Sequence, residues 1–169
     1  QEPYQEARDK GIVVTFQNVD VPQLREGDPY SGYVGQDLYG AGNYLAKSLV
    51  ERNDIEEGAK AVLISTAWEK KGRNQRPIGV EDGLKEKGIE TTRIDLSEEA
   101  HESASKAAPV ISGYLAKNPD TDIIFLDHFE VASAIKMACE DQGISANDVY
   151  GIGFDLNPVV SDLVEEGFI

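Results

Sequence analysis

Amide, carboxylate, imidazole and aromatic side chains follow directly after the most apolar segments of this chain. The candidate site residues found in this way are Gln17, Asn18, Trp68, Asp127, His128 and Asp155. Amides and carboxylates exchange hydrogen bonds with hydroxyl groups, and an aromatic face can cover the apolar side of a ring. This set of side chains therefore favours a binding site for a small, hydroxyl-rich molecule.

Several of these side chains also have a structural interpretation, and both interpretations stay open at this point. Trp68 fits either stacking on a ring or covering the edge of a sheet. His128 fits a polar pocket wall or a plain loop residue, and Gln17 and Asn18 fit ligand contact or support of a hinge backbone. For Asp155 we favour a ligand role, because one carboxylate can accept from two hydroxyl groups, over a turn or a helix cap.

The sequence lacks the residue combinations of common catalytic, metal and cofactor sites. It has one cysteine and two histidines, which are too few for a metal cluster of the usual kind. The glycines at 35, 40 and 42 do not have the spacing of a dinucleotide loop or a P-loop. We therefore expect no catalytic residue, no metal and no cofactor. Cys139 is expected to be a small buried apolar residue.

The charge of the chain restricts its partners. Sixteen Lys and Arg face 31 Asp and Glu, so the formal net charge is −15. Nucleic acids and anionic membrane surfaces attract basic proteins, so neither is an expected partner. No apolar run approaches the roughly 20 residues that cross a bilayer, so we expect no membrane insertion. The spread acidity fits an ordinary solvated surface or adaptation to high salt.

Continuous apolar runs predict strands that are buried on both faces, as in a parallel sheet. The expected strands are residues 11–16, 61–65, 90–94, 123–126 and 149–154. The expected helices are residues 36–52, 74–87, 101–117 and 130–142, and Asn157-Pro158 opens a last one. This alternation predicts an α/β fold with a doubly wound parallel sheet, in which ligands bind beyond the carboxyl ends of the strands.

Two local features modify this plan. Segment 20–32, with two Pro and two Gly, is expected to be the one long loop. Pro109 lies within the third expected helix, so we expect a kink or a late start there. His101, after a charged run, is expected on the surface, and Asp37 is expected to cap the helix that starts near Leu38.

Five motifs follow one another at characteristic spacings. They are GIVVTFQNVD, then Tyr33–Asp37 with Gly42 following, then Asn74-x-Arg76-x-x-Gly79, then Asn118-Pro-Asp120 before Asp122-Ile-Ile-Phe125, and last Gly151–Asp155 followed by Asn157-Pro158. Together they resemble the type I periplasmic sugar-binding proteins of ABC transporters, of the ribose- and galactose-binding kind. The resemblance implies a Rossmann-like lobe and covers nearly the whole chain.

The resemblance implies a division of the chain and a function. Residues 1–19 would be the end of a first lobe and the crossing strand between lobes. Residues 20–169 would be the second, C-terminal ligand-binding lobe, truncated before the return crossing. The protein would clamp a sugar or similar polyol between two lobes by hinge closure and deliver it to an ABC transporter permease. It would be extracytoplasmic, with the signal segment absent from this chain.

The resemblance also implies site residues, one position at a time. The positions that face the sugar in the family fall on Gln17, Asn18, Asn74, His128 (with Asp127 before it) and Asp155. The charged residues of the familiar ribose and galactose binders are mostly replaced, so the resemblance does not identify the exact ligand. Arg76 fits a role near the ligand or an ion-pair role equally well.

Two other functions remain as alternatives. The effector-binding core of a LacI-type transcription regulator has the same fold and most of these motifs. An enzyme on a Rossmann-like sheet is the third hypothesis, but no pair of nucleophile and base supports it. The expected function is therefore that of a solute-binding protein and not of an enzyme.

Overall fold

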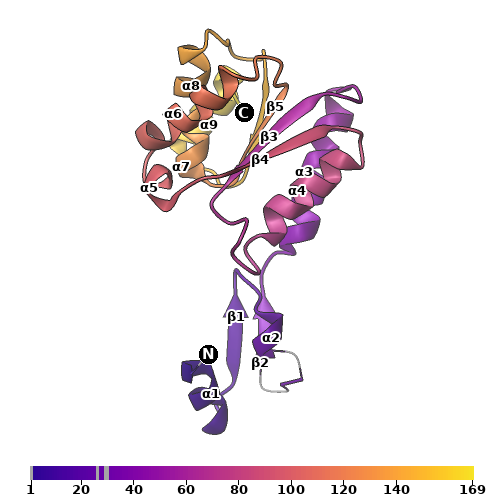
Figure 1. Cartoon of the computed structure of the whole chain (residues 1–169). Helices are drawn as coiled ribbons and strands as arrows, with labels where there is room; N and C mark the ends of the chain where they lie inside the picture. Colours follow the sequence, from indigo (N-terminus) through magenta and orange to yellow (C-terminus); the bar gives the residue numbers. More distant parts are fainter. Residues whose placement is uncertain (1, 26, 29–30) are drawn as a thin grey trace.

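A computed structural model describes residues 2–25, 27–28 and 31–169 of the chain. Figure 1 shows a larger part, in which a sheet lies between helices, and a smaller N-terminal part with its own two strands. The strands pair in parallel in both sheets. The predicted α/β class with a parallel sheet is confirmed.

The sheet of the larger part has four strands in the order β4-β3-β5-β6. These are β3 (Lys60–Ser65), β4 (Glu90–Asp95), β5 (Ile123–Leu126) and β6 (Tyr150–Gly153). The two central strands are β3 and β5, and every residue of β5 is buried. Because both faces of these strands are covered by helices, their sequences are continuously apolar rather than alternating.

Helices cover both faces of this sheet. Ala61, Leu63 and Phe125 pack on one face with α3 (Leu38–Arg52) and α4 (Gln75–Lys85). Side chains of the opposite parity, such as Val62 and Ile64, pack on the other face with the remaining helices. Those helices are α5 (Glu98–His101), α6 (Ala104–Leu115), α7 (Phe129–Ala132), α8 (Ile135–Asp141) and α9 (Pro158–Glu166). Figure 1 shows one layer of helices on each side of the sheet.

Helices α3 and α4 approach each other closely through glycine. A Cβ atom on Gly42 would lie 2.2 Å from the carbonyl oxygen of Arg76, and one on Gly79 would lie 2.2 Å from that of Tyr39. Only glycine permits backbones to meet at these distances. The contact holds α4 against α3. It thereby fixes the position of Arg76, which lies in the first turn of α4.

The smaller part contains α1 (Glu2–Asp9), β1 (Val14–Gln17), α2 (Pro22–Arg25) and β2 (Ser31–Val34). β1 and β2 form a two-stranded parallel sheet. The prediction of one long loop over 20–32 is therefore wrong for the described residues, since α2 and the first residues of β2 lie within it. The sequence of β2, SGYV, contains a single β-branched residue, so its pattern does not predict a strand.

Two predicted helices begin or continue differently in the structure. The helix expected over 101–117 is preceded by the separate α5, and α6 begins at Ala104 and continues through Pro109, so the helix does not start late at this proline. The helix expected over 130–142 is divided into α7 and α8. The Ser133 hydroxyl donates to the carbonyl oxygen of Phe129 at 2.7 Å, and such a local side-chain bond competes with continuation of the helix.

The helix caps and the cysteine agree with expectation. The carboxylate of Asp37 accepts from the backbone N–H of Gly40 at 3.0 Å, and the amide oxygen of Asn157 accepts from that of Val160 at 2.8 Å. Cys139 is fully buried in α8, and this burial raises the pKa of its thiol to about 11. It is therefore a packing residue with little thiolate at neutral pH.

Candidate functional site

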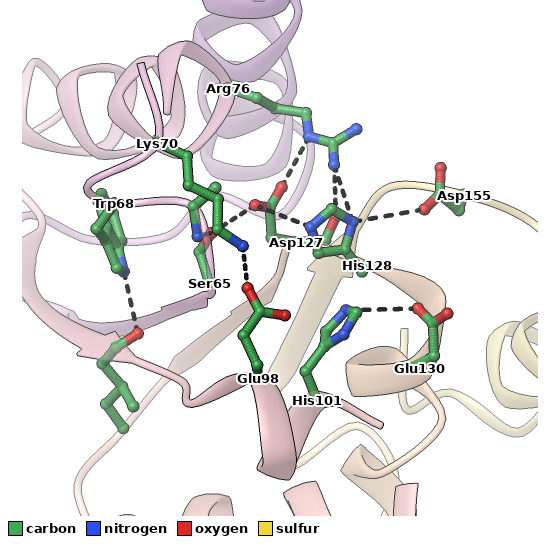
Figure 2. Close-up of polar contacts among 12 residues, drawn as sticks. Ser65, Trp68, Lys70, Arg76, Glu98, His101, Asp127, His128, Glu130 and Asp155 are labelled. Carbon is green, nitrogen blue, oxygen red and sulfur yellow. Dashed lines mark hydrogen bonds and ion pairs between the residues drawn. The ribbon is translucent and has the colours of Figure 1, made fainter. Parts of the chain in front are cut away.

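The carboxyl ends of β3 and β5 lie side by side in the centre of the four-stranded sheet. From β3 the chain continues to β4 on one side, and from β5 it continues to β6 on the other. In open α/β sheets ligands bind at such a switch point. Figure 2 shows the polar side chains gathered there. The hydroxyl of Ser65, at the end of β3, donates to Asp127, just after β5, at 2.5 Å.

Arg76 joins this pair from the first turn of α4. Its Nε donates to Oδ1 of Asp127 at 2.7 Å, and its Nη2 donates to the carbonyl oxygen of Asp127 at 2.8 Å. The guanidinium carbon lies 4.5 Å from the ring centre of Phe154, which adds a cation–π contact. The side chain of Asp127 is 1% exposed and that of Arg76 is 12% exposed.

The carboxylate of Asp127, a predicted ligand contact, is occupied by protein donors in the structure. A buried carboxylate is costly unless it is paired and hydrogen-bonded, and Asp127 meets both conditions through Arg76 and Ser65. Because protein donors occupy both carboxylate oxygens, Asp127 mainly orients its neighbours. Arg76, which the sequence left between two roles, is an ion-pair partner that also borders the site.

His128 follows Asp127 and lies at the centre of the cluster in Figure 2. Its Nδ1 is 3.4 Å from Nη2 of Arg76 and 4.0 Å from Oδ2 of Asp155, and its Nε2 is 3.7 Å from Oδ2 of Asp127. Burial lowers the pKa of His128; Arg76 and His101 act in the same direction, and the two carboxylates oppose them. His128 is therefore held mainly as neutral imidazole at neutral pH.

Asp155 lies just after β6 and supplies an accessible carboxylate. Its side chain is 46% exposed, and it points toward His128 in Figure 2. Its φ angle is 69°, a left-handed conformation that Asp and Asn adopt more readily than most residues. The alternative role of Asp155 as a helix cap does not apply, because Asn157 caps α9. Asp155 is thus free to accept hydrogen bonds from a molecule above the sheet.

His101 was expected on the surface, but the structure places it beside His128. The two rings meet edge to face with centres 5.1 Å apart and an angle of 79° between their planes. The Nε2 of His101 is buried and has no hydrogen-bond partner among the described residues, and the nearest carboxylate oxygen of Glu130 is 3.7 Å away. No pattern in the sequence indicates this contact, because His101 precedes His128 by 27 positions and only the fold brings α5 to the end of β5.

Trp68 has a structural environment. Its side chain belongs to the core under α3 and α4 and is 7% exposed. The indole N–H donates to the carbonyl oxygen of Ile94 in β4 at 3.0 Å, and the guanidinium of Arg93 lies 4.4 Å from the ring. These contacts match the alternative interpretation, in which Trp68 covers the edge of the sheet, and they leave little ring surface for a ligand.

Asn74 precedes α4 without capping it through its side chain. Its amide nitrogen donates to the carbonyl oxygen of Trp68 at 3.2 Å, and its amide oxygen accepts from Gln75 at 3.3 Å. The side chain therefore holds the loop between β3 and α4. The neighbouring Arg76 reaches the cluster, whereas the described side-chain bonds of Asn74 join this loop to the first residue of α4.

Gln17 and Asn18 lie at the end of β1, in the smaller part, and both are exposed. Asn18 has a φ angle of 68°, its N–H donates to Val34, and its carbonyl oxygen accepts from the Tyr33 hydroxyl at 3.1 Å. Their side chains are not part of the cluster around Asp127. A groove of about 510 Å³ lies beside α2 and β2 and reaches the start of α4. It is lined by Asp20, Pro22, Gln23, Tyr33, Gln36, Asp37, Leu38, Tyr39, Gly72 and Gln75.

Two features are absent from the described residues. Within 2–25, 27–28 and 31–169, no three His, Cys, Asp or Glu side chains are grouped so that they could hold a metal ion. In the same residues, no helix has the length and apolar character needed to span a bilayer.

The arrangement is that of a binding lobe: a parallel α/β layer with half-exposed polar groups at its switch point. The model of the periplasmic binding protein domain family matches residues 1–169, and the chain belongs to this family. No curated protein matches the chain.

Solved structures show the same fold. An ABC transporter solute-binding protein from Agrobacterium vitis with bound D-fucose has a TM-score of 0.79 and 20% identity, over 99% of this chain and 56% of that chain. A glucose-galactose binding protein from Geobacillus stearothermophilus has a TM-score of 0.76 and 27% identity, over 97% and 55%.

A third similar structure is a periplasmic solute-binding protein of an ABC transporter from Actinobacillus succinogenes with bound D-allose. Its TM-score is 0.77 and its identity 24%, over 99% of this chain and 59% of that chain. The chain thus spans between 55% and 59% of the length of these three proteins.

Proposed function

We propose that this chain is the ligand-binding lobe of an ABC transporter solute-binding protein and that it binds a sugar or similar polyol. The observation that carries the proposal is the polar cluster at the switch point of a chain that matches the periplasmic binding protein domain over its whole length. Two of the similar structures hold D-fucose and D-allose, which supports a sugar as the ligand class.

Asp155 and His128 are the proposed direct ligand contacts, with Arg76 beside them. The carboxylate of Asp155 is half exposed and can accept from hydroxyl groups, and neutral His128 has one donor and one acceptor nitrogen. Asp127 acts indirectly by holding Arg76. From the crossing segment, Gln17 and Asn18 would add contacts. Trp68 and Asn74 are assigned to packing and loop support, since their polar groups already have partners.

The proposed mechanism is hinge closure around the sugar. In this proposal residues 1–19 belong to the first lobe and the crossing strand, and the ligand-binding lobe follows from residue 20. Because β2 pairs with β1, residues 31–34 of the proposed second lobe lie beside the proposed crossing strand. In this hypothesis the two lobes would close over the groove that α2, β2 and the start of α4 line.

The proposed partner is an ABC transporter permease, and the proposed location is extracytoplasmic, as the family implies. We propose binding without catalysis, because Asp127 is paired with Arg76 and the hydroxyl of Ser65 donates to Asp127 rather than to His128. The solved relatives described above are named as solute- or sugar-binding proteins, so no observation favours a transcription-regulator core.

Calorimetric titration with a panel of pentoses, hexoses and polyols tests this proposal. The complete protein encoded by the gene is expected to bind one of these sugars, and the 169-residue chain more weakly, because it offers one side of the clamp. Asp155→Asn should weaken binding about tenfold, since it removes a charged acceptor.

Asp54→Asn is the matched control. Asp54 is also an exposed aspartate with positive φ, at 49°, but it follows α3 at the opposite end of the sheet. It should leave sugar affinity unchanged. Failure of every sugar to bind the complete protein, or equal loss in both variants, would contradict the proposed function or the proposed site.

A further inference from the structure

The contact between Arg76 and His128 defines which ring nitrogen of His128 carries a proton. A guanidinium group has donors and no acceptor, so its hydrogen bond to Nδ1 at 3.4 Å requires a lone pair on Nδ1. Neutral His128 therefore carries its proton on Nε2, which faces Oδ2 of Asp127 at 3.7 Å. This is the tautomer in which Arg76, His128 and Asp127 all have compatible partners.

Protonation of His128 makes this arrangement unfavourable. Nδ1 would then carry a proton that faces the donors and the positive charge of Arg76. The other carboxylate near Nδ1 is that of Asp155, at 4.0 Å, on the segment after β6. Asp127 is already bonded to Arg76 and Ser65, whereas Asp155 is half exposed and can move toward the ring. A small shift would convert the 4.0 Å approach into a charge-assisted hydrogen bond.

Charged groups of both signs face His128 from every element packed around it. They are Arg76 from α4, Asp127 after β5, Asp155 after β6, His101 and Glu98 from α5 and, behind His101, Glu130 from α7. Burial and the neighbouring Arg76 and His101 disfavour the imidazolium form of His128. Asp127 and Asp155 favour it. The position of Asp155 therefore decides how well the imidazolium is accommodated.

We infer that His128 exchanges its hydrogen-bond partner on protonation, from Arg76 to Asp155. At acidic pH this exchange withdraws both His128 and Asp155 from the sugar. The effect on sugar binding rests on the proposed function. The exchange of partners involves only residues of this chain and does not depend on a bound sugar. Each of the two groups that border the site is tied to the protonation state of one ring.

His101 restricts the motion that the exchange requires. Its ring meets His128 edge to face, so His128 can tilt toward Asp155 more easily than it can turn over. The chain contains two histidines, which makes the exchange directly observable. Nitrogen-15 NMR of histidine side chains distinguishes the two neutral tautomers and the imidazolium, and a His101→Gln variant assigns the signals.

The first experiment is this NMR titration of the 169-residue chain between about pH 5 and 8, without sugar. Neutral His128 is expected to carry its proton on Nε2. Asp155→Asn should move the titration midpoint of His128 to lower pH, and Asp54→Asn should leave it in place. Arg76→Lys, which keeps a positive charge but removes Nη2, should weaken the preference for the Nε2 tautomer.

Two results of this titration would overturn the exchange. One is a neutral His128 with its proton on Nδ1, because Nδ1 could not then accept from Arg76. The other is an equal midpoint in the Asp155→Asn variant, the Asp54→Asn variant and the original chain. Asn at position 155 retains the left-handed backbone, so loss of folding does not complicate this comparison.

The second experiment measures the affinity of the complete protein for its sugar at both ends of the same pH range. Affinity should fall about fivefold or more on acidification, in line with usual coupling strengths, and His128→Gln should remove this dependence. A pH-independent affinity would overturn the effect on binding. If the NMR titration behaves as expected but no sugar binds, the proposed function fails and the partner exchange stands.

Discussion

Asp127 and Glu81 are both buried carboxylates that meet an arginine, yet their surroundings differ. Glu81 lies in α4 and accepts from Arg93 at 3.0 Å and from Lys85 at 2.9 Å, and Arg93 in turn stacks over Trp68. Asp127 instead lies beside a titratable ring, His128, and a half-exposed carboxylate, Asp155.

The difference shows what distinguishes a ligand-binding site from an ion pair that only supports the fold. The partners of Glu81, Arg93 and Lys85, have side chains about half exposed, so water already solvates their outer parts. Arg76 is nearly buried and depends on Asp127 for its compensation. A buried ion pair by itself therefore indicates little about function. Polar groups beside it that keep unused hydrogen-bonding capacity indicate a binding site.

The largest expected effect comes from removing Asp127. Asp127→Ala leaves the nearly buried guanidinium of Arg76 without its carboxylate and should lower the free energy of unfolding by about 3–5 kcal/mol. Urea unfolding followed by circular dichroism measures this loss. Asp162→Ala, at an exposed position of α9, is the control and should change stability by less than about 0.5 kcal/mol. A loss no larger than that of the control would show that Arg76 finds other partners.

A smaller effect is expected for Glu81→Gln, about 1–2 kcal/mol, because Arg93 and Lys85 can turn to water. Burial raises the pKa of Glu81, but hydrogen bonds from Arg93 and Lys85 outweigh it and hold the pKa below the ordinary 4.5. Since the folded pKa is the lower one, this stabilisation is complete above 4.5 and is lost as the pH falls through the folded value.

The difference in stability between the original chain and Glu81→Gln should therefore shrink as the pH falls below 4.5, as urea titrations at a series of pH values would show. A difference that stays constant with pH would mean that the Gln variant is destabilised by altered packing rather than by loss of the ion pairs.

The smallest effect is expected from salt. At a net charge of −15, repulsion among exposed carboxylates should be screened by 1 M KCl, raising the melting temperature by about 2–5 °C. Calorimetry measures this shift. Salt screens buried pairs far less, so the cost of Asp127→Ala should change little. An unchanged melting temperature would favour an ordinary solvated surface over adaptation to high salt.

Much of the fold could be predicted because burial on both faces leaves a local signal. The runs 61–65 and 123–126 are apolar at every central position, and the structure has β3 and β5 there. β2 escaped prediction because SGYV lies in a small sheet and is only partly buried. Its strand character comes from pairing with β1, which the local sequence does not encode.

The site was predictable only in part, for a related reason. The rule that ligands bind at strand ends located Asp127, His128 and Asp155 from the sequence. The same rule also selected Trp68, whose indole turned out to be bonded to β4. Arg76 lies 51 residues from Asp127, and its choice of partner depends on how glycines let α4 pack against α3.

The environment of Trp68 also determines how this protein can be followed in solution. It is the only tryptophan of the 169 residues, and its ring lies between the core and the cation of Arg93, with its N–H bonded to β4. Its fluorescence will therefore report separation of β4 from the sheet, which accompanies unfolding. A sugar above the switch point should leave that emission nearly constant, so binding assays need an extrinsic dye or a heat signal.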